Sequence, residues 1–109
     1  KYYEDYLTKI DWIQKYIFPG SHLPSLAYLV EILAKETSLQ IDSVTNIAQS
    51  YAKTLRAWFD RFNGSTLPAR YDSKFRRMWG YYLAGCEAEF RTNWLSLLQI
   101  RLVRPNRRV

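Results

Sequence analysis

The chain has 109 residues, of which 48% are hydrophobic and 17% aromatic, and its formal net charge is +6. This composition is too apolar for an intrinsically disordered chain, and the length suits a single domain, residues 1–109, rather than two. No run of about 18 uncharged apolar residues predicts a transmembrane helix, and a single cysteine, Cys86, cannot form an internal disulfide bond.

The start of the chain and the charge of its two halves are also informative. The sequence begins at Lys1 without a signal-peptide pattern or an initial Met, so we expect a piece of a longer chain. Residues 1–50 carry 4 basic and 6 acidic side chains, whereas residues 51–109 carry 12 basic and 4 acidic ones. A basic half of this kind meets nucleic acid, an anionic membrane surface or only water.

The first predicted element is an amphipathic helix over residues 2–17, where apolar side chains recur at helical spacing. Pro19 and Gly20 end it. The loop around them, YIFPGSHLPS, contains three large apolar side chains, Ile17, Phe18 and Leu23. A plain surface turn would be polar, so this loop is expected to face something apolar.

A second helix and a strand follow the loop. Pro24 sets the entry to the helix and Ser25 is its expected N-cap, while the apolar stripe fades near Thr37. The segment 39–47, LQIDSVTNI, is short and rich in β-branched residues, which predicts a strand.

Two longer helices are predicted next, over residues 50–62 and 72–92, joined by the loop NGSTLPAR at residues 63–70. Asp72 or Ser73 can cap the later helix, and Glu87 and Arg91 in that helix form a favourable pair four residues apart. The last element is a strand over residues 95–103, with apolar side chains alternating on one face. Two strands alone are marginally stable, so they are expected to join a larger sheet.

Self-sufficient catalytic chemistry is absent from the sequence. None of the four glycines forms the GxGxxG pattern of a nucleotide-binding loop. One His and one Cys cannot build a typical zinc site, so no metal is expected. A nucleophilic pair of His22 and Cys86 lacks a third group to orient it, and His22 is more simply a solvated or packed loop residue.

Three blocks of the sequence together carry a family resemblance. They are YIFPGSHLPS (16–25), SYAKTLRAWFDRF (50–62) and DSKFRRMWGYYLAGCEAEFR (72–91). In order and content they resemble the C-terminal part of the cyclopropane-fatty-acyl-phospholipid synthase family, which includes the mycolic acid cyclopropane synthases. The resemblance implies an α+β fragment: helices plus a two-stranded antiparallel unit, the C-terminal part of a seven-stranded Rossmann-like methyltransferase fold.

The resemblance also implies an activity. Family members transfer a methylene from S-adenosylmethionine to a cis double bond of a lipid acyl chain, and a bound bicarbonate removes a proton. The tyrosine that opens the YAxTL block binds bicarbonate in the family, which assigns this role to Tyr51. The other bicarbonate ligands and the cofactor loop lie upstream in the family, so this chain alone is expected to be inactive and to bind neither cofactor. Positions that line the family's acyl channel are Phe18, Leu23, Leu55, Tyr82 and Cys86.

Partners and alternatives follow from the same residues. A lipid substrate implies phospholipid acyl chains and the inner membrane face as partners, a cytoplasmic peripheral location and no nucleic acid. An exposed strand edge predicts self-association or a domain swap. Without the resemblance, Tyr51 and Leu55 would be core residues and Tyr82 ordinary helix packing. The alternative function is a stand-alone basic, aromatic-rich module for nucleic acid, although most aromatics lie on apolar stripes.

Overall fold

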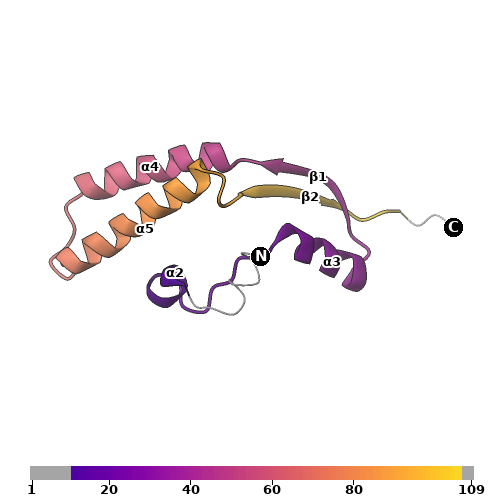
Figure 1. Ribbon diagram of the computed structural model, residues 1–109, viewed down its shortest axis with the longest axis horizontal. Coiled ribbons are helices and arrows are strands. Elements are labelled where there is room, and N and C mark those ends of the chain that lie inside the picture. Colours follow the sequence, from indigo (N-terminus) through magenta and orange to yellow (C-terminus); the bar gives the residue numbers. More distant parts are fainter. Residues whose placement is uncertain (1–10, 107–109) are drawn as a thin grey trace. The chain divides into compact units, whose positions relative to one another are not determined.

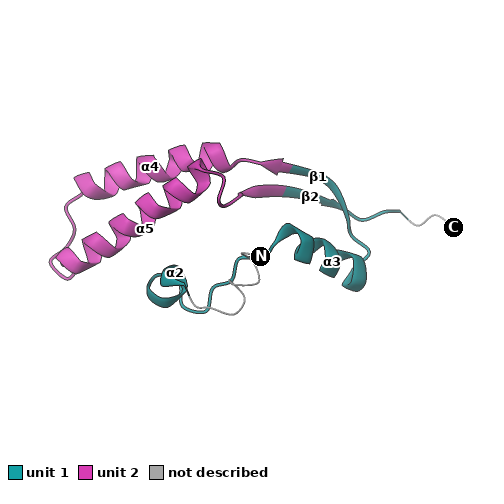
Figure 2. Ribbon diagram, in the orientation of Figure 1, with its two compact units in different colours: residues 1–44, 100–109 teal, residues 45–99 magenta. Residues whose placement is uncertain are grey.

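The computed structural model describes residues 11–106 (Figure 1). These residues belong to two compact units, which Figure 2 separates by colour. Unit 1 comprises residues 1–44 with 100–109, and unit 2 comprises residues 45–99. Each unit is described by itself below. The order of elements, helices followed by a strand and then two helices and a strand, agrees with the order predicted from the sequence.

Unit 2 is built on an antiparallel helical hairpin of α4 (Ala48–Gly64) and α5 (Ser73–Arg91). Asp72 is the N-cap of α5, and its side chain accepts a hydrogen bond from the Phe75 amide at 2.9 Å. The two helices bury one apolar stripe each against the other, because their apolar residues recur every three to four positions. The buried residues are Ala48, Ala52, Leu55, Leu83, Cys86 and Phe90.

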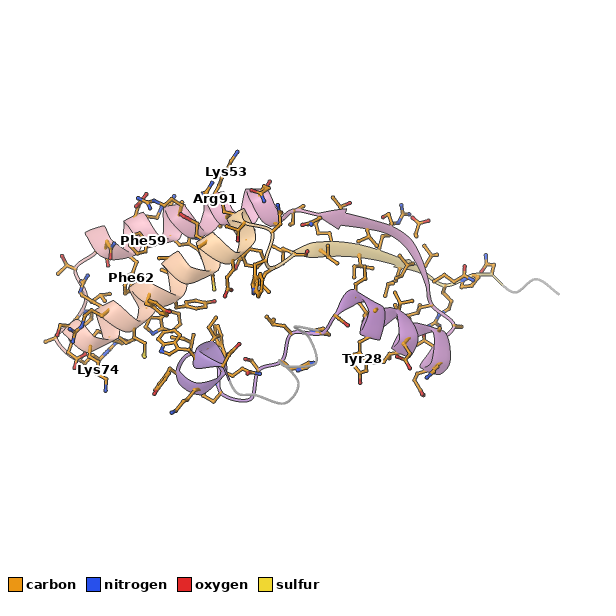
Figure 3. The ribbon with its side chains drawn as sticks, in the orientation of Figure 1. Tyr28, Lys53, Phe59, Phe62, Lys74 and Arg91 are labelled. Atoms are coloured by element: carbon orange, nitrogen blue, oxygen red, sulfur yellow. The ribbon has the colours of Figure 1, made fainter. Side chains whose placement is uncertain are left out.

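Aromatic rings continue the packing between α4 and α5 toward the loop that joins them. Phe59 and Phe62 extend from α4 into the space between the helices (Figure 3). The Phe62 and Phe75 rings lie 6.4 Å apart, and a Cβ at Gly80 would lie 3.8 Å from Phe59. The predicted loop began too early: α4 continues through Gly64, because helix packing extends to Phe62, and the loop spans residues 65–72.

In unit 1, the structure corrects the predicted helix at residues 2–17. A short helix, α2, covers only Trp12–Tyr16, and Asp11 is its N-cap in an extended conformation. The Asp11 side chain accepts from the Gln14 amide, and the Gln14 side chain accepts from the Asp11 amide. This capping box starts a new helix at Trp12, so a continuous helix through Asp11 is wrong. Residues 2–10 of the prediction lie outside the described residues.

The next helix of unit 1, α3, covers Leu26–Glu36 and confirms the predicted N-cap. Ser25 Oγ accepts a hydrogen bond from the Tyr28 amide at 3.1 Å. The helix ends at Glu36, and the C-cap residue Thr37 donates its hydroxyl hydrogen to the Leu33 carbonyl. Leu33 is buried, whereas Tyr28 projects away from the strands (Figure 3).

The two strands, β1 (Gln40–Asn46) and β2 (Leu98–Val103), pair antiparallel in a two-stranded sheet, as predicted. Arg101 and Asp42 face each other across the pair, with 3.3 Å between Nη1 and Oδ2. Next to the strands, the Ile47 amide donates to the Leu97 carbonyl at 2.8 Å.

The second strand starts three residues later than predicted. Asn93 adopts a left-handed φ of 59°, and the amides of Trp94 and Leu95 donate to the Glu89 carbonyl. This turn ends α5 and engages Trp94 and Leu95, so these residues are not part of β2, which begins at Leu98. The expected apolar face of β2 is also incomplete, because Leu98 and Ile100 are half-buried but Leu102 is exposed.

Candidate functional site

Tyr51 lies in the first turn of α4, and its amide donates to the Ile47 carbonyl at 3.0 Å. Its ring is half-buried and meets two other rings edge-on. The Phe90 ring is 5.0 Å away at 84°, and the Trp58 ring is 6.0 Å away at 89°. These contacts are the edge-to-face geometry that aromatic rings prefer, so they fix the direction of the Tyr51 side chain.

The surroundings of Tyr51 keep its hydroxyl protonated. Burial raises the pKa of the Tyr51 phenol above its ordinary value, and the nearby Cys86 thiol raises it further. A neutral phenol both donates and accepts hydrogen bonds. The Tyr51 hydroxyl is therefore available as a hydrogen-bond donor at any pH near neutrality.

Tyr82 and Cys86 lie one turn apart on α5, opposite Tyr51. Burial raises the pKa of Tyr82 to about 12, helped by Cys86 and Tyr51 and by a hydrogen bond with the Cys86 side chain. The Trp79 ring meets the Tyr82 ring edge-on at 5.4 Å. Two phenols, both in neutral form, and one thiol are thus gathered between the two helices.

Leu55 completes this group on α4, one turn after Tyr51. Its side chain is 1% exposed and Cys86 is 7% exposed, so both belong to the core of the hairpin. The structure therefore brings together four of the six residues singled out in the sequence: Tyr51, Leu55, Tyr82 and Cys86. Their shared burial also agrees with the simpler interpretation of Leu55 as a core residue, so a channel-lining role stays a prediction.

Phe18 and Leu23, the other two residues, belong to unit 1. Both are exposed, at 46% and 55%. Their loop has a defined backbone: the Phe18 amide donates to the Ile13 carbonyl, and the Ser21 amide donates to the Phe18 carbonyl. Gly20 has a φ of 79°, a conformation that glycine adopts without strain.

Gln49 is a positioning residue that the sequence did not reveal. Its side-chain amide donates to the Phe90 carbonyl at 3.2 Å and to Asn93 Oδ1 at 3.0 Å. These bonds tie the start of α4 to the end of α5 and so hold Phe90 against Tyr51. Its partners lie more than forty residues away in the sequence, so no local pattern identifies this contact.

Two further properties concern the described residues as a whole. Between residues 11 and 106, no group of three or more His, Cys, Asp or Glu side chains could hold a metal ion. Over the same range, no helix has both the length and the apolar character that a membrane crossing requires.

Sequence comparisons place this arrangement among known proteins. The profile of the family described as mycolic acid cyclopropane synthetase matches residues 2–100. The tuberculostearic acid methyltransferase UfaA1 of Mycobacterium tuberculosis is 42% identical over 96 residues, which cover 85% of this chain and 22% of that protein. The cyclopropane-fatty-acyl-phospholipid synthase of Escherichia coli is 34% identical over 91 residues, covering 82% of this chain and 23% of that protein.

A more distant relative, the sphingolipid C9-methyltransferase A of Emericella nidulans, is 30% identical over 105 residues, or 94% of this chain and 20% of that protein. The chain therefore spans about a fifth of the length of these three relatives, and its match to the cyclopropane-fatty-acyl-phospholipid synthases covers their C-terminal portion. Its helices and antiparallel strand pair match a fragment of the methyltransferase fold, as the sequence predicted. The chain belongs to the mycolic acid cyclopropane synthetase family.

Proposed function

We propose that the chain is the C-terminal part of an S-adenosylmethionine-dependent lipid methyltransferase that forms cyclopropane rings at cis double bonds of phospholipid acyl chains. Family membership and the names of the relatives support a lipid methyltransferase. The single observation that carries the assignment to particular residues is the cluster of Tyr51, Tyr82 and Cys86 between α4 and α5.

In this proposal Tyr51 binds bicarbonate, the base of the reaction. A base held next to an electron-deficient acyl chain needs hydrogen-bond donors that are not themselves strong nucleophiles. The Tyr51 phenol meets this need, because its raised pKa keeps it neutral and protonated. S-adenosylmethionine supplies the methyl group, and no residue of this chain is assigned to its binding.

The remaining residues provide an apolar environment that excludes water from the reacting carbon atoms. Tyr82 and Cys86 lie beside Tyr51, and Leu55 is buried in the hairpin core one turn after Tyr51. Phe18 and Leu23 present exposed apolar side chains on the ordered loop of unit 1. We assign all five to acyl-chain contacts in the complete enzyme, which works at the cytoplasmic membrane surface.

The substitution Tyr51→Phe in the complete protein tests the role of the phenol. It keeps the ring contacts with Phe90 and Trp58 but removes the donor, so the packing cost should stay near 1 kcal/mol. Loss of one such donor lowers turnover by up to about 10²-fold. Added bicarbonate should partly restore the rate, because the variant binds it more weakly.

The matched control is Tyr81→Phe, which removes a hydroxyl from an exposed tyrosine on α5 and should leave turnover unchanged. Turnover is measured as transfer of labelled methyl groups to phospholipid over a series of bicarbonate concentrations. A Tyr51→Phe enzyme that matches the wild type throughout the series would show that Tyr51 is structural.

A second experiment tests which cofactor contacts this chain contributes. The 109-residue chain alone should show no methyl transfer, because it supplies one bicarbonate ligand and no S-adenosylmethionine site. Calorimetry with S-adenosylmethionine should give a dissociation constant above about 100 μM, weaker than roughly −5.5 kcal/mol. Tighter binding would mean that this chain contains a cofactor site of its own.

A further inference from the structure

Basic side chains concentrate at one end of the α4–α5 hairpin, around the loop at residues 65–72. Two acidic residues lie between positions 56 and 77, and both already interact with other groups of the protein. Asp60 pairs with Arg56 at 3.3 Å, and Asp72 caps α5. The basic residues between positions 56 and 77 are Arg56, Arg61, Arg70, Lys74, Arg76 and Arg77.

Four of these cations form what we call the basic tip: Arg61, Arg70, Lys74 and Arg77. All four are exposed, and none has an acidic partner among residues 11–106. At the opposite end of the hairpin, a basic side chain is paired with an acidic one. There Arg91 pairs with Glu87, and Figure 3 shows Lys53 and Arg91 at that end and Lys74 beside the loop.

The placement of Lys74 is unfavourable for α5 itself. Lys74 is the second residue of α5, and the first turn of this helix contains no acidic residue. The amino end of a helix has a partial positive charge, so a cation there opposes the helix dipole. Arg61 lies in the last turn of α4, where a cation is favoured. The local fold therefore does not account for Lys74, although an external anionic partner would.

The loop that carries the tip is ordered by its own contacts. The Arg76 guanidinium donates to the Ser65 carbonyl at 2.6 Å and lies 6.0 Å from the centre of the Phe62 ring. The Tyr71 amide donates to the Pro68 carbonyl at 2.9 Å, and the Tyr71 ring packs 4.7 Å from Phe75. These contacts fix the backbone of the loop around which the cations lie.

The segment between the cations is uncharged. Residues 65–69, STLPA, separate Arg61 from Arg70 and include Leu67 and Pro68. A short apolar segment flanked by basic residues suits the boundary between lipid headgroups and acyl chains. Nucleic acid bound at the tip would require exposed rings beside the cations for stacking, whereas the rings at this end of the hairpin, Phe62, Tyr71 and Phe75, pack against one another.

We propose that the basic tip docks onto an anionic lipid bilayer, with Leu67 and Pro68 toward the headgroups. This inference rests on the proposed function, because an enzyme that modifies phospholipids must reach a bilayer. It goes beyond that function by assigning the docking surface to the α4–α5 loop. Each cation near an anionic leaflet contributes about a fivefold gain in binding. Replacing two tip cations should therefore weaken binding by about 30-fold.

The test uses Lys74→Gln/Arg77→Gln in the complete protein and measures cosedimentation with vesicles of equal parts phosphatidylglycerol and phosphatidylcholine. The matched control, Lys53→Gln/Arg104→Gln, removes the same charge from exposed positions outside the tip. The tip variant should bind about 30-fold more weakly, and the control should bind nearly as well as the wild type. Pure phosphatidylcholine vesicles should bind none of the three proteins.

Thermal unfolding by circular dichroism checks that both variants fold as the wild type does. Equal losses in the tip variant and the control would overturn the proposal, because binding would then depend only on net charge. Displacement from the vesicles by single-stranded DNA or by an acidic protein at the same salt concentration would also overturn it, in favour of that partner.

Methyl transfer to detergent-dispersed phospholipid separates this inference from the proposed function. The tip variant should keep the wild-type rate there, because the tip lies outside the catalytic cluster. A wild-type protein that binds vesicles through the tip but transfers no methyl group would contradict the proposed function alone. Normal vesicle binding by the tip variant would contradict the docking proposal alone.

Discussion

The two units of the chain bury their apolar residues very differently. Unit 2 encloses six buried residues between α4 and α5, whereas in unit 1 only Leu33 is buried among the described residues. The helix α3 of unit 1 also exposes more than a third of Leu26, Tyr28, Val30 and Ile32. A helical hairpin can satisfy two apolar stripes by itself, but α3 has apolar residues on more sides than the described chain covers.

Unit 1 also contains a groove of about 630 Å³, which lies beside α3 and the start of β1. Its lining is mostly apolar and includes Val30, Leu39, Ile41 and Pro105. The comparison teaches that the amphipathic pattern of a sequence reports what an element needs to bury. It does not report whether a neighbouring segment of the same chain meets that need.

The largest expected difference between the units comes from shortening a leucine in each. Leu55→Ala in unit 2 should lower the free energy of unfolding by about 2–5 kcal/mol, because it leaves a cavity in a closed core. Leu26→Ala in unit 1 should cost less than about 1 kcal/mol, because that side chain is 39% exposed. Urea unfolding measures both, and hydrogen exchange reports each unit separately. Equal costs would show that the cores do not differ.

The next effect is a loss of stability at high pH that is confined to unit 2. Burial raises the pKa of Tyr82 from 10.0 to about 12, so folding favours its neutral form. This stabilisation is complete below about pH 10 and disappears as the pH rises through about 12. The raised pKa of Tyr51 acts in the same direction.

We therefore expect the amides of α4 and α5 to lose exchange protection in this alkaline range. Tyr82→Phe should reduce the loss, whereas Tyr81→Phe, on the exposed side of α5, should not. Identical pH profiles for the two variants would remove the link between the cluster and stability.

Replacing one glycine by alanine in each unit should change the unfolding free energy by a smaller amount, and with opposite signs in the two units. Gly85 lies inside α5 and a Cβ there would meet no atom within 4 Å, so Gly85→Ala should stabilise the helix by about 1 kcal/mol. Gly20 has a φ of 79°, so Gly20→Ala should destabilise the loop of unit 1 by about 1 kcal/mol. Thermal unfolding distinguishes the two. The same sign for both would contradict the described backbone at one of these glycines.

The smallest effect is expected for the ion pair across the strands. Asp42 and Arg101 are both largely exposed, so Asp42→Asn should change the unfolding free energy by no more than about 0.5 kcal/mol. The change should vanish in high salt, because exposed charges are screened. A large or salt-independent change would mean that the strand pair depends on this contact.

Local signals in the sequence predicted much of the fold. The expected caps were Ser25 and either Asp72 or Ser73, because a short polar side chain precedes an apolar periodic run at both places. Ser25 and Asp72 cap their helices. The break at Asp11 also had a local signal, the spacing of Asp11 and Gln14. It was missed because the apolar period continues across it, so periodicity alone favoured one long helix.

The candidate site was predictable in part for a different reason. Tyr51, Leu55, Tyr82 and Cys86 were singled out by family motifs, and the pairing of α4 with α5 brings them together. The late start of β2 was missed because only the left-handed Asn93 marks the turn, and asparagine also occurs in many other conformations. Gln49 was missed because its partners are distant in the sequence.

The nested arrangement of the chain from β1 to β2 has a consequence for the order of folding. The α4–α5 loop needs the shortest closure, so we expect the two helices to pair first. The Gln49 contacts and the Ile47–Leu97 hydrogen bond lie progressively farther from that loop. Asp42 and Arg101 are separated by about 60 residues, a costly closure for an unfolded chain. Once the helices have paired, only short segments remain to be closed, so the strand pair can form as the last step. The rate at which the strands pair should therefore follow the folding rate of the helical hairpin.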